Sequence, residues 1–344
     1  MAECTLIAVD IAKSVFQIVV LTGSRRVDYR VRRPEFLAFF VDRPPALVFM
    51  EACGSAHAWA RQIQALGHEV RLLPPHYVRP FVRRNKTDRT DAHGILDAGR
   101  QADIQWVPIK SVDQQILTSL HRLRSGWIAE RTARINALRG LLRELGFIIP
   151  VGAERVIPHV HAIIGDPDND LPTALRTQFQ IACTEVRDIE QRIEGTTRRI
   201  EALAQDNAVV TRLCTVPGIG LITSTALLAF VGDVQRFPTG RRFASFLGLT
   251  PREHSSGLRH LRGGISKRGD SYLRTLLIHG ARSALLGAQR TRTPDHLRTW
   301  ALTLRTRHGH NVAAVALANK LARIAWAVWR SEREFISAPA PTPA

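Results

Sequence analysis

The strongest constraint on the fold is the order of the short apolar runs in the first hundred residues. These runs are rich in β-branched side chains, and several end at Gly, Pro or a carboxylate, which is typical of strands. Segments with helical spacing separate the later runs. We predict strands at 5–10, 15–22, 27–31, 46–50 and 69–73, and helices at 34–41, 55–66 and 88–101. A three-strand meander followed by alternating helices and strands predicts a mixed α/β sheet.

The charge of the chain indicates a polyanionic partner. The 344 residues include 48 Lys or Arg and 30 Asp or Glu, a formal net charge of +18. Nucleic acid is the expected partner for such an excess. An anionic membrane surface is the alternative, but no basic amphipathic stretch stands beside an apolar anchor. The most apolar C-terminal stretch, 312–329, is interrupted by Lys320 and Arg323, so we expect no membrane span.

The cysteines and the N-terminus predict a cytoplasmic protein. No two of the four cysteines have CxxC spacing, which argues against a zinc knuckle or a disulfide framework and fits a reducing cytosol. Asp10 and Lys13 interrupt the apolar N-terminal run, which is atypical of a signal peptide.

Leucine and isoleucine spacing predicts an extended helical region after the sheet. The segments 112–145 and 175–204 repeat apolar residues at threes, fours and sevens, which indicates two long helices joined by a loop at 150–172. We expect an antiparallel coiled coil that acts as a spacer or a dimerisation arm. The predicted domains are 1–110, 111–205 and 206–335, the last mostly helical, with a disordered tail at 336–344.

Four acids in the N-terminal domain are candidate metal ligands. Asp10 ends the first strand, Glu51 follows the fourth, and Asp88 and Asp91 share one face of a helix that begins after Thr87. The element order is that of ribonuclease-H-like domains, in which these places converge above the sheet. Such oxygen ligands suit Mg²⁺ or Mn²⁺, and two ions support phosphodiester chemistry. A turn former or helix cap explains any one acid alone, but the four together favour the metal site.

Three cations precede the Asp pair. Arg83, Arg84 and Lys86 stand where a phosphate backbone would approach the acids, and a solvated loop is the alternative interpretation.

A glycine-containing turn begins the third domain. Val216-Pro217-Gly218-Ile219-Gly220 precedes a helical run and resembles a helix-hairpin-helix turn, whose backbone amides bind a DNA phosphate. Gly218 and Gly220 are therefore candidate nucleic-acid contacts. An ordinary turn between two helices is the alternative.

The basic excess is concentrated in this domain. Between Arg236 and His310 there are 15 Lys or Arg and 3 Asp or Glu. The Gly/Ser/Arg-rich segment 248–270 lies between two predicted helices, and its cations are candidate nucleic-acid contacts: Arg252, Arg262, Lys267 and Arg268. Ser256 stands next to Gly257 among these cations and has the parts of a nucleophile that attacks phosphate, although on chemistry alone a plain loop is favoured.

At these residues the chain resembles the DEDD transposases of bacterial insertion sequences, the IS110 family and its IS1111 subgroup. The similarity covers nearly the whole chain. The matching segments, in order, are 8–13, 50–52, 85–92, 216–220, 248–251, 255–257 and 264–267.

The resemblance implies more than the residues themselves indicate. It implies a RuvC-like domain, a coiled coil and a C-terminal transposase domain with a helix-hairpin-helix-like motif. It also implies that the four acids bind metal and that Ser256 forms a 5′-phosphoserine link, with Ser255 as a second serine beside it. Family members act as oligomers, from dimer to tetramer, in which one protomer's acids meet another's serine. A structured non-coding bridge RNA selects donor and target DNA.

Three functions follow from these observations. The first is an RNA-guided recombinase that moves an insertion sequence. The second is a metal-only nuclease of the Holliday-junction type, which needs the acids and no serine. The third is a non-catalytic DNA- or RNA-binding protein, which needs neither.

Overall fold

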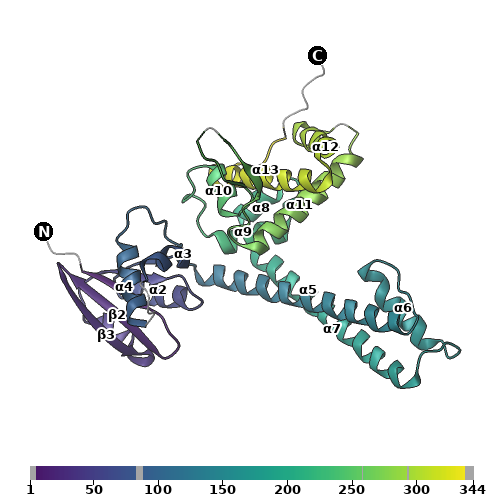
Figure 1. Cartoon of the computed structure of the whole chain (residues 1–344), viewed down its shortest axis with the longest axis horizontal. Coiled ribbons are helices and arrows are strands. Elements are labelled where there is room, and N and C mark those ends of the chain that lie inside the picture. The colour runs from purple at the N-terminus through teal and green to yellow at the C-terminus, as the bar shows by residue number, and fades with distance from the viewer. Residues whose placement is uncertain (1–4, 83–87, 258, 293, 338–344) are drawn as a thin grey trace, which may run out of the picture. The chain divides into compact units, whose positions relative to one another are not determined.

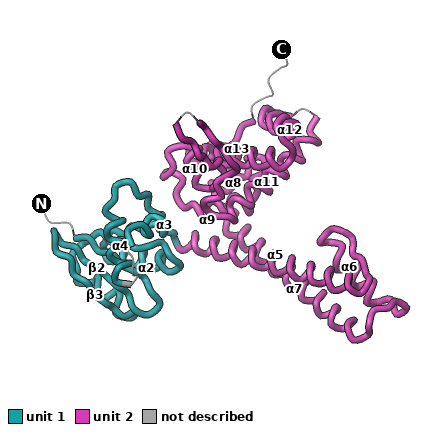
Figure 2. The backbone as a smooth tube through the Cα atoms, viewed as in Figure 1, with its two compact units in different colours: residues 1–111 teal, residues 112–344 magenta. Residues whose placement is uncertain are grey.

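The chain forms two compact units. The computed structural model describes residues 5–82, 88–257, 259–292 and 294–337, and its units are residues 1–111 and 112–344 (Figure 2). The first boundary falls next to the predicted one. The segments 111–205 and 206–335, predicted as separate domains, both belong to the second unit from residue 112 onward. The predicted tail lies outside the described residues from 338.

The first unit contains the predicted mixed α/β sheet. Its strands are β1 (Leu6–Asp10), β2 (Val15–Thr22), β3 (Arg25–Arg32), β4 (Leu47–Glu51) and β5 (Glu69–Leu73). They lie in the order β3-β2-β1-β4-β5. The meander β1-β2-β3 is antiparallel, whereas β4 pairs parallel with both β1 and β5. The prediction of a mixed sheet is confirmed.

Helices cover both faces of this sheet (Figure 1). Side chains alternate between the faces along each strand. Ile7 and Val9 pack with α2 (Ala56–Ala65) in one cluster, and Ala8 packs with α4 (Asp88–Gly99) in the other. α4 packs so closely on the sheet that a Cβ on Gly99 would lie 2.5 Å from the Phe49 ring.

Short helices complete the first unit. The predicted helix 34–41 is instead a 3-10 turn, η1 (Arg33–Glu35), followed by α1 (Ala38–Val41). Pro34 lies in the first turn of η1, and Phe36 and Phe40 are both fully buried, with ring centroids 5.3 Å apart. After β5 follow α3 (Pro75–Val78) and η2 (Arg79–Phe81).

The second unit begins with two long helices that pack antiparallel. They are α5 (Val112–Glu144) and α7 (Thr173–Ala204), close to the predicted ranges. Arg124 donates a hydrogen bond to Thr197, and Arg134 forms an ion pair with Glu185. Residue numbers therefore rise along α5 as they fall along α7. The predicted loop between them is wrong in part, because it contains α6 (Ala153–Gly165). Val156 and Val160, one turn apart, are fully buried and hold α6 against the pair despite Pro158.

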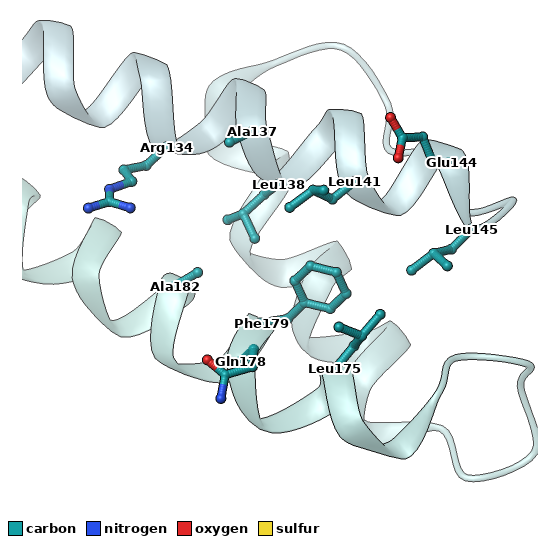
Figure 3. Close-up of a pocket in the computed structure, with 10 residues that line it drawn as sticks. All are labelled: Arg134, Ala137, Leu138, Leu141, Glu144, Leu145, Leu175, Gln178, Phe179 and Ala182. Atoms are coloured by element: carbon teal, nitrogen blue, oxygen red, sulfur yellow. The ribbon is translucent and has the colours of Figure 1, made fainter.

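An apolar pocket of about 350 Å³ lies between α5 and α7 (Figure 3). Leu138 and Leu141 from α5, with Leu145 directly after its end, face Leu175 and Phe179 from α7. Its charged lining residues are Arg134 and Glu144 alone among the described residues. The pocket therefore offers apolar surface and no chemistry for phosphate transfer.

Among the described residues, six further helices and a β-ribbon form the rest of the second unit. The helices are α8 (Ala208–Cys214), α9 (Leu221–Val231), α10 (Gly240–Phe246), α11 (Ser271–Arg290), α12 (His296–His308) and α13 (His310–Ser331), and the strands are β6 (Pro251–Glu253) and β7 (Arg262–Ile265). α13 has the length and composition of a membrane span, but half of its apolar window is buried. Leu317, Leu321 and Ala325 belong to the core that α13 shares with its neighbouring helices.

Candidate functional site

Two of the predicted metal ligands lie side by side where the inner strands β1 and β4 end. β1 and β4 are parallel neighbours in which Val9 stands opposite Met50. The next residues, Asp10 and Glu51, are therefore the last residues of their strands at the same end of the sheet. Both side chains are half-buried. The register thus brings together two carboxylates that are 41 positions apart in the sequence.

The other two acids belong to the first turn of α4. This helix packs on β1 and β4 through Ala92 and Ile95, which contact Ala8 and Phe49 in one apolar cluster. Asp91 is half-buried beside Ala92. Asp88 is the first residue of α4, and its side chain lies outside the described part of the structure.

Ion pairs hold the outer side of α4 to β3. His93 Nε2 lies 2.8 Å from the Asp28 carboxylate, and Arg26 donates to Asp97 at 2.7 Å. Sequence reasoning missed this link. Its signal was Arg89, His93 and Asp97 at steps of four residues, which places them on one stripe of the helix. Asp28 and Asp97 therefore serve the packing of α4.

The four predicted acids have the donor chemistry of a hard cation site. Asp10, Glu51, Asp88 and Asp91 offer only carboxylate oxygens, which Mg²⁺ and Mn²⁺ prefer. Among the described side chains, no three His, Cys, Asp or Glu groups approach closely enough to hold one ion. The fourth predicted ligand, Asp88, is outside that set. Arg83, Arg84, Lys86 and the predicted cap Thr87 also lie outside the described residues.

The predicted glycine turn joins α8 to α9, as expected, but Gly218 has a packing role. Gly218 has φ +80°, and a Cβ there would lie 2.4 Å from the carbonyl oxygen of Gly280 on α11. Gly280 makes the reciprocal approach to the Gly218 carbonyl. Gly220 is the exposed residue before α9 and has open space around it, so it is the more accessible of the two candidate phosphate contacts.

A second pair of glycines closes the base of the ribbon. Gly248 (φ +72°) would place a Cβ 1.9 Å from the Arg268 carbonyl oxygen, and Gly269 (φ +92°) would place one 2.0 Å from that of Phe246. The Lys267 amide donates to the Gly248 carbonyl at 3.1 Å. Lys267 itself has φ 55°, a left-handed conformation that non-glycine residues seldom adopt. The segments 248–251 and 264–267, which carry the family resemblance, therefore lie in close backbone contact at the base of the ribbon.

Ser256 lies at the tip of a two-stranded ribbon rather than in a plain loop. Ser256 and Arg259 exchange backbone hydrogen bonds of 3.1 Å in both directions. Gly257, directly after Ser256, has φ +55°, which suits the first position of a tight hairpin turn. The Ser256 side chain is exposed. The Gly- and Arg-rich composition hid the strands, because neither residue type is typical of them.

The two adjacent serines occupy opposite faces of the ribbon. The Ser255 hydroxyl donates to the Glu253 carboxylate at 2.8 Å, and His260 Nδ1 lies 3.8 Å from the same carboxylate. Because side chains alternate along a strand, Glu253 and Ser255 share one face. Ser256, the next residue, therefore lies on the other face. The structure thus gives the two serines different surroundings.

The predicted cations surround this ribbon. Arg252 and Lys267 line a cavity of about 1050 Å³, and Arg262 lines a second cavity of about 560 Å³ with Arg241. Arg268 is exposed at the base of the ribbon.

The three acids of this basic region are already engaged. Asp270 caps α11 by accepting from the Leu273 amide at 3.0 Å, and Asp295 caps α12 by accepting from the Arg298 amide at 2.7 Å. Glu253 accepts from Ser255. The local cations therefore outnumber the carboxylates that could neutralise them, which favours an anionic ligand.

Two family profiles match the chain over these same regions. One is described as "Transposase IS116/IS110/IS902 family" and matches residues 210–301. The other is a DEDD transposase profile of the IS110 type and matches residues 7–147. The first includes the ribbon, and the second includes the four acids.

Similar proteins cover almost the full chain. A protein of Pseudomonas aeruginosa named "Probable family 20 transposase" is 43% identical over 95% of this chain and 97% of its own length. The transposase for insertion sequence element IS1111A of Coxiella burnetii is 38% identical over 97% of this chain and 92% of its own length. A more distant relative, the pilin gene-inverting protein of Moraxella lacunata, is 25% identical over 96% of this chain and 97% of its own length.

Proposed function

The chain belongs to the IS116/IS110/IS902 family of transposases, and we propose that it cuts and rejoins DNA through a covalent link to Ser256. The Ser256 hydroxyl oxygen attacks the scissile phosphorus, and the bond from phosphorus to the 3′ oxygen breaks. The serine proton passes to solvent, and the leaving 3′ oxygen takes one up. In rejoining, a 3′ hydroxyl attacks the phosphoserine and the serine oxygen leaves. Each step breaks one phosphate ester bond and forms another, so no outside energy source is needed.

The observation that carries this proposal is the setting of Ser256. It is exposed at the tip of a ribbon in the most basic part of the chain, and Gly257 leaves open space beside it. Its neighbour Ser255 is hydrogen-bonded to Glu253 on the opposite face. These features favour Ser256 over Ser255 as the group that reaches a DNA phosphate. Arg252, in the same ribbon, is suited to stabilise charge on the phosphate oxygens.

The four predicted acids of the first unit supply the second part of the proposed chemistry. Asp10, Glu51, Asp88 and Asp91 would hold Mg²⁺ or Mn²⁺ as oxygen ligands. When bound, such ions activate the attacking oxygen and stabilise the leaving one. The register that sets Asp10 beside Glu51 supports this role, as does the packing of α4, which begins with the other two acids, on the same strands.

The proposed partners follow from the charge and the family resemblance. We assign donor and target DNA to the basic surfaces of the second unit, including Gly220 and the ribbon cations. A structured bridge RNA encoded by the insertion sequence would select both DNA sites. The chain would act as a cytoplasmic oligomer, from dimer to tetramer.

A covalent trapping experiment tests the proposal. The purified chain is incubated with DNA that spans the junction of its own insertion sequence, together with transcripts of the adjacent non-coding DNA and Mg²⁺. We expect a protein–DNA adduct on a denaturing gel that Ser256→Ala lacks. DNA cut to free hydroxyl and phosphate ends, without any adduct, would instead identify a metal-only nuclease that uses the same four acids.

A further inference from the structure

The larger cavity beside the ribbon is a groove between three elements. It lies between the β6–β7 ribbon, the N-terminal half of α13 and Trp300 of α12, and its volume is about 1050 Å³. We call it the ribbon groove. The side chains that matter most are Arg252, Lys267, Trp300, Val312, Lys320 and Arg323. Trp300, Lys320 and Arg323 were not predicted as part of any functional site.

The ribbon groove carries positive charge without compensation. Arg252, Lys267, Lys320 and Arg323 line it, and no Asp or Glu is among its described lining residues. Within the described part of the chain, none of these four cations pairs with a carboxylate. Four cations around one cavity repel one another unless an anion lies between them. The groove therefore suits a ligand with more than one negative charge.

The floor of the groove is apolar. Val312, Val315 and Ala316 of α13 form this floor, and Val312 is 55% exposed. Lys320 Nζ lies 4.1 Å from the centre of the Trp300 ring. Burial and the nearby Arg323 lower the pKa of Lys320, and a bound anion would favour its charged form. The ligand therefore needs apolar surface as well as negative charge.

Unpaired nucleotides have both properties. Their bases cover apolar and aromatic surface, while their phosphates meet the surrounding cations. A duplex presents phosphates on its outside but keeps its base faces stacked within, so it would leave the apolar floor uncovered. The combination of floor and charge thus favours a single strand over a duplex.

The groove adjoins the ribbon that carries Ser256 at its tip. Arg252 of β6 lines it and precedes Ser256 by four residues in the same ribbon. The position of the groove relative to the ribbon is held from both sides. Asn319 of α13 donates to the Leu249 carbonyl at 3.0 Å, and the Gly248–Arg268 contact holds Lys267 in its left-handed conformation.

We propose that the ribbon groove binds unpaired nucleotides of the DNA strand on which Ser256 acts. This inference rests on the proposed function, because it takes the strand to be the one joined to Ser256. It adds a binding site that holds the separated strand by its bases and phosphates next to the nucleophile. Trp300 and Val312 would contact bases, and Lys320 and Arg252 would contact phosphates.

Fluorescence anisotropy tests the groove without any catalysis. The full chain is titrated against labelled twelve-nucleotide single-stranded DNA, single-stranded RNA and duplex DNA of equal length. Val312→Glu puts a carboxylate on the exposed floor, and Leu286→Glu does so at an equally exposed apolar position on α11, outside the groove. We expect Val312→Glu to weaken single-stranded DNA binding about tenfold and duplex binding less than threefold. Leu286→Glu should change both by less than about twofold.

A second pair of variants guards against misfolding. Lys320→Gln removes a groove cation, and Arg290→Gln removes an exposed cation of α11 that lies outside the groove. Circular dichroism checks the fold of all four proteins. Equal effects within either pair would overturn the proposal, as would equal losses of duplex and single-strand binding. Selective loss of RNA binding would show that RNA occupies the groove and would also overturn it.

The trapping experiment separates this inference from the proposed function. If Ser256→Ala abolishes the adduct while Val312→Glu binds single-stranded DNA normally, the function stands and the groove proposal fails. If Val312→Glu loses single-strand binding but the wild-type chain forms no adduct, the groove binds DNA and the serine mechanism fails.

Discussion

His121 and Tyr272 lie 151 positions apart in the sequence, and their side chains are joined by a hydrogen bond of 3.0 Å. His121 is fully buried, and its other ring nitrogen lies 3.1 Å from the Thr225 hydroxyl. One residue of α5 therefore binds both α9 and α11. This contact fastens the long helix pair to the helical remainder of the second unit.

The buried His121 predicts a pH-dependent stability. Burial, with a smaller effect from Arg124, lowers the pKa of His121 from 6.5 to about 4. Between these two pKa values the unfolded chain binds more protons at His121 than the folded chain does. The contribution of neutral His121 to the free energy of unfolding is therefore complete above pH 6.5 and falls as the pH decreases toward 4. The slope from this group is at most about 1.4 kcal/mol per pH unit.

Urea unfolding at pH 5 and pH 7.5 measures this effect. His121→Gln should unfold at lower urea than wild type at pH 7.5 and lose less stability on acidification. His308→Gln, at an exposed histidine of α12, is the control and should keep the wild-type pH dependence. If the wild type and His121→Gln respond equally to pH, His121 is not the responsible group.

The close approach of Gly218 and Gly280 predicts a large effect of one methyl group. A Cβ on Gly280 would lie 1.9 Å from the Gly218 carbonyl oxygen, so Gly280→Ala forces the turn away from α11. We expect a loss of about 1–3 kcal/mol in the free energy of unfolding. Gly287→Ala on the same helix has open space and should stabilise by up to about 1 kcal/mol. Thermal unfolding of the two variants distinguishes these outcomes, and equal melting temperatures would contradict the packing argument.

Features set by local sequence signals could be predicted, whereas features set by long-range packing could not. The strands 15–22 and 69–73 have the predicted bounds, because alternation and turn residues are local signals. The neighbourhood of Asp10 and Glu51 was also predictable, since the element order implies which strands pair. α6 was missed because Pro158 is typical of a break, whereas the burial of Val160 against α5 and α7 decides the outcome.

The parts of the candidate site that could not be predicted depend on long-range packing. The separation of Ser255 from Ser256 requires the ribbon register, which no local pattern in a Gly- and Arg-rich segment reveals. The ribbon groove requires Trp300 and Lys320 to meet across two helices. Gly280 also had no signal of its own, because a helical glycine reveals its role only through the backbone that approaches it.

The two serines predict opposite outcomes for two neighbouring substitutions. Ser256→Ala should abolish the protein–DNA adduct, because it removes the proposed nucleophile. Ser255→Ala should retain adduct formation within about threefold, since it removes only a hydrogen bond to Glu253, of the kind that contributes about 1 kcal/mol or less. Peptide mapping of the adduct identifies the modified serine. Loss in Ser255→Ala with retention in Ser256→Ala would move the nucleophile by one residue.

Two acids on α4 provide a matched test of the metal site. Asp91→Asn should abolish DNA cleavage while DNA binding persists, because it removes a proposed metal ligand. Asp97→Asn breaks only an exposed ion pair with Arg26, worth about 0–1 kcal/mol, and should keep cleavage. Cleavage by wild type should stop on chelation and return with Mg²⁺ or Mn²⁺. Full cleavage by Asp91→Asn would remove this residue from the metal site.

The basic second unit predicts a steep salt dependence of DNA binding. Each phosphate that a cation neutralises releases counterions and contributes about −0.9 to the slope of log affinity against log salt for duplex DNA. Arg262→Gln and Arg268→Gln should therefore each reduce the magnitude of the slope by about 0.9 if each contacts one phosphate. Arg198→Gln on α7, whose guanidinium pairs with Glu194 at 2.7 Å, is the control and should leave the slope unchanged. Titrations between 50 and 200 mM salt measure the slopes, and a flat wild-type profile would exclude these cations as the main grip on DNA.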